Sequence, residues 1–287
     1  MASSFAGRWD LTVGSGDAAF PSWLELTEGA TGWSGRLVGV VGSARPIPHI
    51  EVSGSRLSFS LPPQYEGFPG DMAFEADLVG DTLQGTTNSK DGGSLPWVGV
   101  RQPEATPGEP VWGEPIELIG CGMAGWVARW PQMQNNWSNV DGALQNSAVG
   151  TDLISEASFG DFQLLAEYSY PKGSNSGIYL RGRYEFQVLD DYGSEPSVGG
   201  SGGIYGFLTP RVNAIRPFGE RNTLELTLVG RTVSAKLNGK TLYENDEIPG
   251  ITGGALDSRE GEPGPILIQG DHGPVTYHRL RVTPRVG

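Results

Sequence analysis

Apolar and polar residues alternate along most of the first hundred positions of the chain. The alternation is clear at 57–61, which reads LSFSL, and again at 74–78, which reads FEADL. A period of two is typical of a β-strand with one buried face. The segments with this pattern, each bounded by Gly, Pro, Ser or Asp, are GRWDLTV from Gly7, SWLELTE from Ser22, GWSGRLVGVVGSA from Gly32, RLSFSLP from Arg56, DMAFEADLVG from Asp71, DTLQGTTN from Asp81 and PWVGVRQ from Pro96. The pattern predicts a small antiparallel β-barrel or sandwich of about seven or eight strands at 1–103.

A second group of strands follows a proline-rich stretch. Residues 103–115 read PEATPGEPVWGEP, a composition that is typical of a linker, and we place the linker at 104–115. Beyond it, alternating segments are joined by turn signals such as Asn238-Gly239. These segments are DFQLLAEYSY from Asp161, SGIYLRG from Ser176, RYEFQVLD from Arg183, NTLELTLVGRTVSAKLNGKTLYEN from Asn222 and GPILIQGDHGPVTYHRLRVTP from Gly264. They predict a second domain at 116–287, a β-sandwich of hairpins.

Composition and charge narrow the class of partner. The 44 glycines and 21 prolines suit many tight turns, and the eight tryptophans and nine tyrosines suit both strands and sugar-stacking surfaces. The net charge is −13, with no basic block, so nucleic acid is excluded as a main ligand. No stretch has the roughly 18 apolar residues of a membrane span, so we expect no membrane partner. The oligomeric state cannot be predicted.

The start of the chain and its single cysteine add little chemistry. MASSFAGRWD has neither a charged nor an apolar leader region, so we expect a cytoplasmic protein. Cys121 has no partner for an intramolecular disulfide and no nucleophile signature around it, so we expect an ordinary thiol.

Polar side chains gather on two consecutive strands around Gly182. Strand parity places Tyr179 and Arg181 on one face of the first strand, and Arg183, Glu185 and Gln187 on the polar face of the second. Large polar groups beside an aromatic ring are typical of a binding face, although a solvated outer face would show the same pattern. We predict that Arg181, Glu185 and Gln187 line one concave surface together with Gln269 and His272.

Two more segments carry candidate groups for this surface. IQGDHG at 268–273 places Gln269, Asp271 and His272 at the end of a strand, and a neutral imidazole is well suited to move a proton near neutral pH. The glycine-rich loop 190–207 contains Asp190 and Tyr205 and could lie over a pocket. Asp190 and Asp191 offer hard oxygen ligands, so a divalent metal ion is one option for a cofactor. His278 and His49 suit packing or surface positions.

The motif NSGIYLRGRYEFQVLDDYG at 175–193 resembles the signature of the 3-keto-disaccharide hydrolase family. The resemblance continues, in the family's order, through GTDLISEASFGDFQLLAEYSY, GGIYGFLTPRVNAIRPFGERNTLELTLVG and GPILIQGDHGPVTYHRLRV, and covers about 112–284. It implies a concanavalin-like jelly-roll sandwich and cleavage of the glycosidic bond of sugars oxidised at carbon 3. The Asn-Gly-Lys-Asp-Leu start common in the family is absent here.

The chemistry that a 3-keto sugar allows differs from that of an ordinary glycosidase. Retaining glycosidases of this fold place two carboxylates on alternate positions of one strand, and here only Glu185 is acidic on that face. A 3-ketone acidifies the proton on carbon 2, so a base can start β-elimination, after which water adds back. His272 or Glu185 could be the base, and Arg181, Arg183 or a metal could hold the enolate oxygen. Catalytic roles therefore fall to His272, Glu185 and Arg181. Substrate-binding roles fall to Tyr179, Arg183, Gln187, Asp190, Tyr205, Gln269 and Asp271. The alternative is a non-catalytic, lectin-like carbohydrate-binding protein, which has no need of the base.

Overall fold

The computed structural model describes residues 4–104, 108–120 and 122–287; Cys121, named above, lies outside them. The chain forms two compact units. One contains Met1–Glu104 together with Gly250–Gly261, and the other contains Ala105–Pro249 and Glu262–Gly287. The part of the chain that is described is nearly all β, which confirms the predicted fold class of a jelly-roll sandwich preceded by a small antiparallel β domain.

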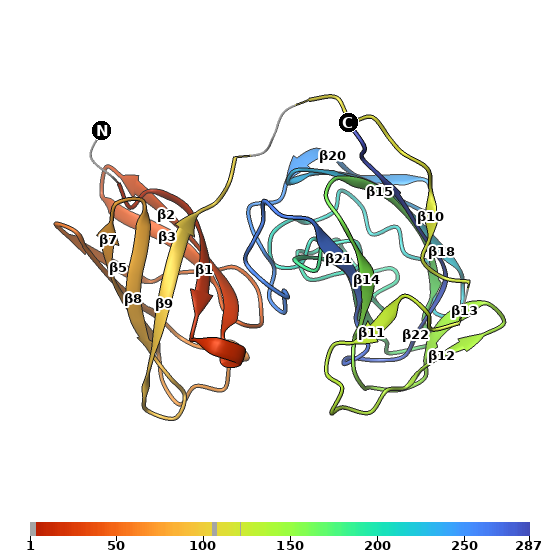
Figure 1. Cartoon of the computed structure of the whole chain (residues 1–287), viewed down its shortest axis with the longest axis horizontal. Helices are drawn as coiled ribbons and strands as arrows, with labels where there is room; N and C mark the ends of the chain where they lie inside the picture. Colours follow the sequence, from red (N-terminus) through yellow and green to blue (C-terminus); the bar gives the residue numbers. More distant parts are fainter. Residues whose placement is uncertain (1–3, 105–107, 121) are drawn as a thin grey trace. The chain divides into compact units, whose positions relative to one another are not determined.

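The first unit is an antiparallel meander of nine strands (Figure 1). Its strands are β1 (Gly7–Val13), β2 (Phe20–Gly29), β3 (Gly32–Val38), β4 (Arg45–Pro46), β5 (His49–Ser53), β6 (Arg56–Leu61), β7 (Met72–Val79), β8 (Thr82–Asn88) and β9 (Ser94–Arg101), with a short 3-10 helix η1 at Gly16–Ala18. They lie in the order β4-β3-β2-β1-β9-β8-β7-β6-β5, and β3 also contacts β5, so the sheet curls towards a barrel. Inward-facing residues such as Trp9, Leu11 and Phe59 fill its interior.

A segment distant in sequence belongs to this first unit. Residues 250–261, which the sequence placed in the second domain, pack on the outer face of the meander. Gly254 N–H donates to Val40 O at 3.0 Å, and the hydroxyls of Thr12 and Ser258 lie 3.3 Å apart. Gly250 lies so close to Trp23 that a Cβ there would come within 2.2 Å of the indole nitrogen. Only glycine fits this contact, which explains how a Gly-rich loop can cover a large aromatic ring.

The second unit consists of two antiparallel sheets. The larger has eight strands in the order β12-β13-β22-β15-β18-β19-β20, with β10 paired to β22; the smaller has five in the order β11-β14-β21-β16-β17. Strands of the larger sheet are β10 (Ile116–Glu117), β12 (Trp137–Val140), β13 (Ala143–Asn146), β15 (Phe162–Ser169), β18 (Asn222–Val229), β19 (Thr232–Leu237), β20 (Lys240–Glu247) and β22 (Val275–Pro284). Strands of the smaller sheet are β11 (Trp126–Ala128), β14 (Leu153–Phe159), β16 (Asn175–Leu180), β17 (Tyr184–Leu189) and β21 (Gly264–Ile268).

Each sheet buries one apolar face in the sandwich core. Leu164, Leu226 and Val282 of the larger sheet are almost fully buried, as are Ile178 and Phe186 of the smaller one. These positions follow the alternation of the sequence, because residues two apart on a strand share a face. The opposite face of the smaller sheet therefore carries Tyr179, Glu185 and their neighbours.

Candidate functional site

The candidate site lies on the face of the five-stranded sheet that points away from the core. Tyr179 of β16 pairs across the strands with Glu185 of β17, and Gly177 pairs with Gln187. On the other side of β16, Gln269 N–H donates to Gly177 O at 2.9 Å, which places Gln269 in the same row. Glu185, Gln187 and Gln269 thus share one face, as predicted, but they are buried and not solvated.

Glu185 is a buried acid with an unusual proton affinity. Burial raises its pKa to about 8, the charges of Asp271 and Asp152 add to this, and His272 and a hydrogen bond from the Tyr179 hydroxyl oppose it. That hydroxyl donates to Glu185 Oε2 at 3.0 Å, and burial raises the pKa of Tyr179 well above its usual value. At neutral pH Glu185 is therefore mostly protonated and can supply a proton.

Asp271 and His272 form a pair in the loop after β21. His272 Nδ1 lies within hydrogen-bonding distance of Asp271 Oδ1, and this bond raises the pKa of His272. An Nδ1–H donated to the carboxylate leaves Nε2 of the neutral ring as the free base. The His272 side chain is 51% exposed, so substrate and solvent can reach it. Gln269, three positions before His272, lies in the row of Glu185. The charges of His272 and Glu185 also shift each other's pKa, so we treat the two groups as parts of one candidate site.

Asp152 and Arg129 belong to this cluster, although the sequence analysis did not single them out. Asp152 Oδ1 accepts hydrogen bonds from the N–H groups of Gly270 at 2.9 Å and Asp271 at 3.3 Å, and Oδ2 lies 3.2 Å from Arg129 Nη1. Burial and the charge of Asp271 raise the pKa of Asp152. The sequence feature that could have identified Asp152 is its position directly before the strand in GTDLISEASFG.

The predicted place of Arg181 is wrong. Its φ is +53°, so it lies in the turn between β16 and β17, where strand alternation stops. Its guanidinium bonds the Gly230 carbonyl and lies 3.3 Å from the Tyr184 hydroxyl, on the core side. Arg183 is buried as well and donates to the carbonyl of Glu262 at 2.7 Å. Both arginines stabilise the hairpin through these contacts, which direct their guanidinium groups away from the position expected for the enolate oxygen.

The loop after β17 carries two of the predicted site residues, and only Tyr205 lies next to Glu185. Tyr205 N–H donates to Glu185 O at 3.0 Å and Ile204 bridges Phe186, so the loop extends the sheet and places Tyr205 opposite Glu185. Asp190 instead accepts a hydrogen bond from Gly173 N–H at 2.7 Å at the open end of the hairpin. Asp191 holds Ser201 N–H and the Asn213 amide. Both carboxylates thus have protein partners, and across 4–104, 108–120 and 122–287 no group of three His, Cys, Asp or Glu is arranged for a metal.

His278 and His49 lie away from this cluster. His278 Nε2 lies 2.8 Å from the Ser169 hydroxyl on the eight-stranded sheet, and His49 is exposed beside Glu51 in the first unit. Both positions agree with a packing or surface role.

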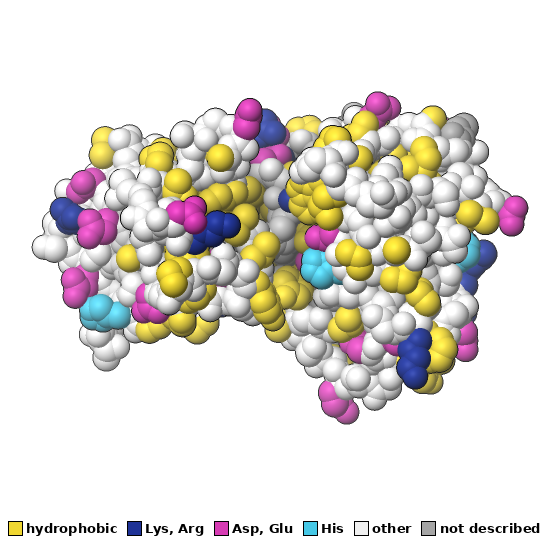
Figure 2. Space-filling model, turned by 90° about the horizontal axis from the view of Figure 1, so that it is seen from below, with side chains coloured by type: hydrophobic (Ala, Val, Ile, Leu, Met, Phe, Trp, Pro, Cys, Tyr) yellow, Lys and Arg dark blue, Asp and Glu magenta, His cyan; other side chains and the backbone are white. Residues whose placement is uncertain are grey.

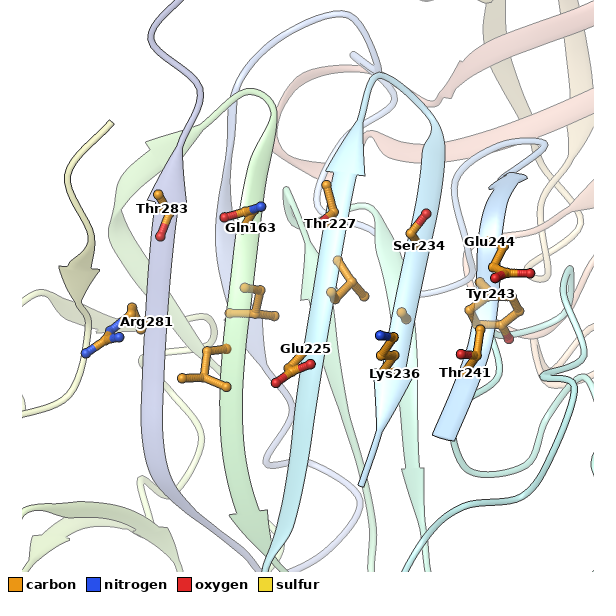
Figure 3. A pocket seen from close by; sticks show the side chains of 14 residues that line it. Gln163, Glu225, Thr227, Ser234, Lys236, Thr241, Tyr243, Glu244, Arg281 and Thr283 are labelled. Carbon is orange, nitrogen blue, oxygen red and sulfur yellow. The ribbon is translucent and has the colours of Figure 1, made fainter. Parts of the chain in front are cut away.

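A hollow of about 500 Å³ lies on the outer face of the eight-stranded sheet (Figure 3). Hydroxyl, amide and charged side chains from neighbouring strands line it, including Gln163, Thr227, Glu225 and Lys236. Glu225 and Lys236 pair across β18 and β19 in this lining, but none of the described residues around Glu185 contributes to it. We therefore place the chemistry at Glu185.

Among the described residues, basic side chains do not gather into one large patch on the face of the molecule drawn in Figure 2. On the face drawn in Figure 2, the Lys and Arg side chains of the described residues form separate small groups among acidic ones. No helix among these residues has the length and apolar character needed to cross a membrane.

Comparison with protein families matches residues 114–283 to the 3-keto-alpha-glucoside-1,2-lyase-like domain. The chain belongs to this family, as the sequence motifs predicted, and is thereby a carbohydrate-active protein. A comparison with curated proteins gave no match.

Solved structures of low sequence identity resemble part of this chain. A protein from Parabacteroides distasonis assigned as a glycosyl hydrolase is 23% identical, with a TM-score of 0.50 over 64% of this chain and 94% of that one. A second from the same organism is 19% identical, with a TM-score of 0.47 over 60% and 100%. The carbohydrate-binding module CBM66 of Bacillus subtilis is 12% identical, with a TM-score of 0.38 over 55% and 94%.

Proposed function

We propose that this protein cleaves the glycosidic bond of 3-keto-glycosides or 3-keto-disaccharides by β-elimination followed by hydration. The observation that carries the proposal is that a buried Glu185, whose pKa is raised to about 8, and a half-exposed Asp271–His272 pair influence each other electrostatically. Elimination needs one base and one acid; the neutral form of His272 can serve as the base and the protonated form of Glu185 as the acid. Membership of the 3-keto-alpha-glucoside-1,2-lyase-like family supports a 3-keto-glycoside as the substrate class.

In this mechanism His272 is the base. Neutral Nε2 takes the proton from carbon 2, and the electron pair of that bond delocalises onto the 3-ketone as an enolate. Asp271 stabilises the imidazolium that forms, because it accepts the Nδ1–H. The enolate then re-forms the ketone, a double bond forms between carbons 1 and 2, and the bond from carbon 1 to the leaving oxygen breaks.

Glu185 is the acid that protonates the leaving oxygen. Its carboxyl group keeps its proton up to a pH of about 8, which suits proton donation at neutral pH. Water then adds to the unsaturated sugar, with its oxygen on carbon 1 and a hydrogen on carbon 2.

Arg129 replaces Arg181 and Arg183 as the cation proposed for the enolate oxygen. Its Nη1 lies 3.2 Å from Asp152 Oδ2, and its charge lowers the pKa of Tyr179, which supports a position near this face of the sheet. A fixed cation near developing negative charge lowers the barrier, since it needs no reorganisation during the reaction.

A reaction in D₂O with a 3-keto-disaccharide tests the proposal. Elimination and rehydration should place deuterium on carbon 2 of the released 3-keto sugar, while direct hydrolysis at carbon 1 should not. Free 3-keto sugar incubated with the enzyme measures background exchange. Sugar release without label on carbon 2 would exclude elimination, provided that the base exchanges the abstracted proton with solvent before carbon 2 is protonated again. Binding of the 3-keto-disaccharide without any release would favour the lectin-like alternative.

Replacing Tyr179 with phenylalanine should move the alkaline limb of the pH–rate profile upwards. The lost hydrogen bond stabilises the Glu185 carboxylate, so its removal raises the pKa of Glu185 above about 8. The acid then stays protonated to higher pH. The measurement is kcat against pH, with Tyr168→Phe as the control, because Tyr168 is a buried tyrosine of the other sheet. An unchanged or lowered limb in Tyr179→Phe would show that Glu185 is not the titrating acid.

A further inference from the structure

The row of residues beside Glu185 contains a glycine between two glutamines. Gly177 lies on β16, Gln187 is its partner on β17, and Gln269 bonds it from the other side. Neighbouring strands are about 4.8 Å apart, so both glutamines stand next to the gap that a side chain at position 177 would fill. The side chains of both glutamines point away from the core, as would a side chain at position 177.

The glycine is required by the carboxyl group of Glu185. A Cβ at position 177 would lie 2.5 Å from Glu185 Oε1 and 2.9 Å from its Cγ, so the acid leans over the bare backbone. The glutamines on either side of Gly177 therefore border the acid itself. Any sugar ring that presents its leaving oxygen to Glu185 must lie against this row.

Both glutamines have a buried side-chain oxygen that can accept a hydrogen bond. Gln187 is 4% exposed and Gln269 is 7% exposed, yet no donor among the described residues reaches the Oε1 of either. Gln187 Nε2 donates to Gly199 O at 3.4 Å, which sets the orientation of that amide. Asn175, two positions before Gly177 on the same face of β16, likewise has a buried Oδ1 without a donor.

Buried acceptors without donors destabilise a folded protein, and their concentration on one face beside the acid calls for a ligand that donates hydrogen bonds. Sugar hydroxyl groups are such donors. Carboxylates and phosphates at neutral pH are not, and they would also meet the acidic groups Asp152, Asp271 and Glu185.

We propose that Gln187, Gln269 and Asn175 form a hydroxyl-recognition subsite next to Glu185. It accepts hydrogen bonds from free hydroxyl groups of the sugar ring that carries the cleaved bond. The inference rests on the proposed function and deepens it: the ring is a neutral sugar whose hydroxyls at this subsite are unsubstituted. A site built to bond a hydroxyl discriminates strongly against an analogue that lacks it, because its acceptors are then left unpaired.

The test combines side-chain and substrate deletions. Gln187→Met and Gln269→Met keep the length of the side chain and remove the acceptor; Gln163→Met, on the outer face of the other sheet, is the control. Substrates are 4-nitrophenyl 3-keto-α-glucoside and its 4-deoxy and 6-deoxy analogues. We expect wild-type kcat/KM to fall about tenfold or more on removal of a recognised hydroxyl. The methionine variant that lacks the acceptor for this hydroxyl should show a similar fall in kcat/KM on the parent substrate. Its kcat/KM should then fall little further on the analogue that lacks the hydroxyl. Additive losses in both variants, on both analogues, would overturn the subsite.

Folding stability gives a second readout that does not depend on catalysis. Gln269→Met should unfold at an equal or higher temperature than wild type, since a buried acceptor without a donor is replaced by an apolar group of similar size. Gln187→Met removes such an acceptor as well, but it also loses the long hydrogen bond from Nε2 to Gly199 O, so its unfolding temperature should stay near that of wild type. A clear loss of stability in both would show that the amides serve packing, which contradicts the inference.

Failure of the proposed function can be told apart from failure of the subsite. If wild type leaves every 3-keto-glucoside intact, the proposed reaction is wrong, and the subsite is judged by binding of methyl α-glucoside in NMR titrations. Weaker binding to the methionine variants than to wild type and Gln163→Met supports it. Equal binding, or no binding to wild type, overturns it.

Discussion

Replacing His272 with alanine should lower kcat by about 10² to 10⁴ fold while KM changes only a few fold. A general base acts in the transition state, so its loss affects turnover far more than ground-state binding. Steady-state kinetics on a 3-keto-disaccharide measure both constants. His278→Ala is the matched control, because His278 bonds Ser169 on the other sheet and should leave kcat near the wild-type value.

The same experiment on Glu185 separates acid from base. Glu185→Gln should slow substrates with a poor alcohol leaving group strongly and those with 4-nitrophenol much less, since nitrophenolate leaves without a proton. A large loss on both substrates, with a mild effect of His272→Ala, would assign the base to Glu185. The roles proposed here would then be reversed.

Glu185→Gln should also make the protein more stable than wild type at alkaline pH. A glutamate has an ordinary pKa of 4.5, and the pKa of Glu185 is about 8 in the folded state. Below pH 4.5 Glu185 is protonated in both the folded and the unfolded state. As the pH rises from 4.5 to about 8, the unfolded state gains stability by losing this proton while the folded state still keeps it, so the free energy of unfolding falls. Between these values unfolding releases a proton, so wild type loses about 1.4 kcal/mol per pH unit that the glutamine variant does not lose.

Urea unfolding at pH 5, 7 and 9 measures this difference. The variant should gain on wild type by roughly 3 to 5 kcal/mol between pH 5 and pH 9. Glu156→Gln, at an exposed position of β14, should run parallel to wild type at every pH. A stability difference between Glu185→Gln and wild type that stays constant with pH would contradict the protonated, buried state of Glu185.

The alternation along the chain predicted both β units and most long strands because each strand buries one face. β1 begins and ends where GRWDLTV does, and the apolar residues of β16 and β17 fill the core as expected. The sequence missed β5, since the prolines of PIPHI interrupt the alternation, and it missed short strands such as β11 and β12. A strand of three or four residues shows too little of a period to be recognised.

The sequence by itself determined that Glu185 and Gln187 lie on one polar face, because parity within a strand is a local property. Only the tertiary structure decided what accompanies them. Asp152 reaches the site through backbone contacts with Gly270 and Asp271, residues more than a hundred positions away. Arg181 leaves the face because a left-handed turn interrupts the alternation, and the pKa of Glu185 depends on burial by the whole fold. Pairing between distant strands and burial are properties of the assembled sandwich, which no local pattern encodes.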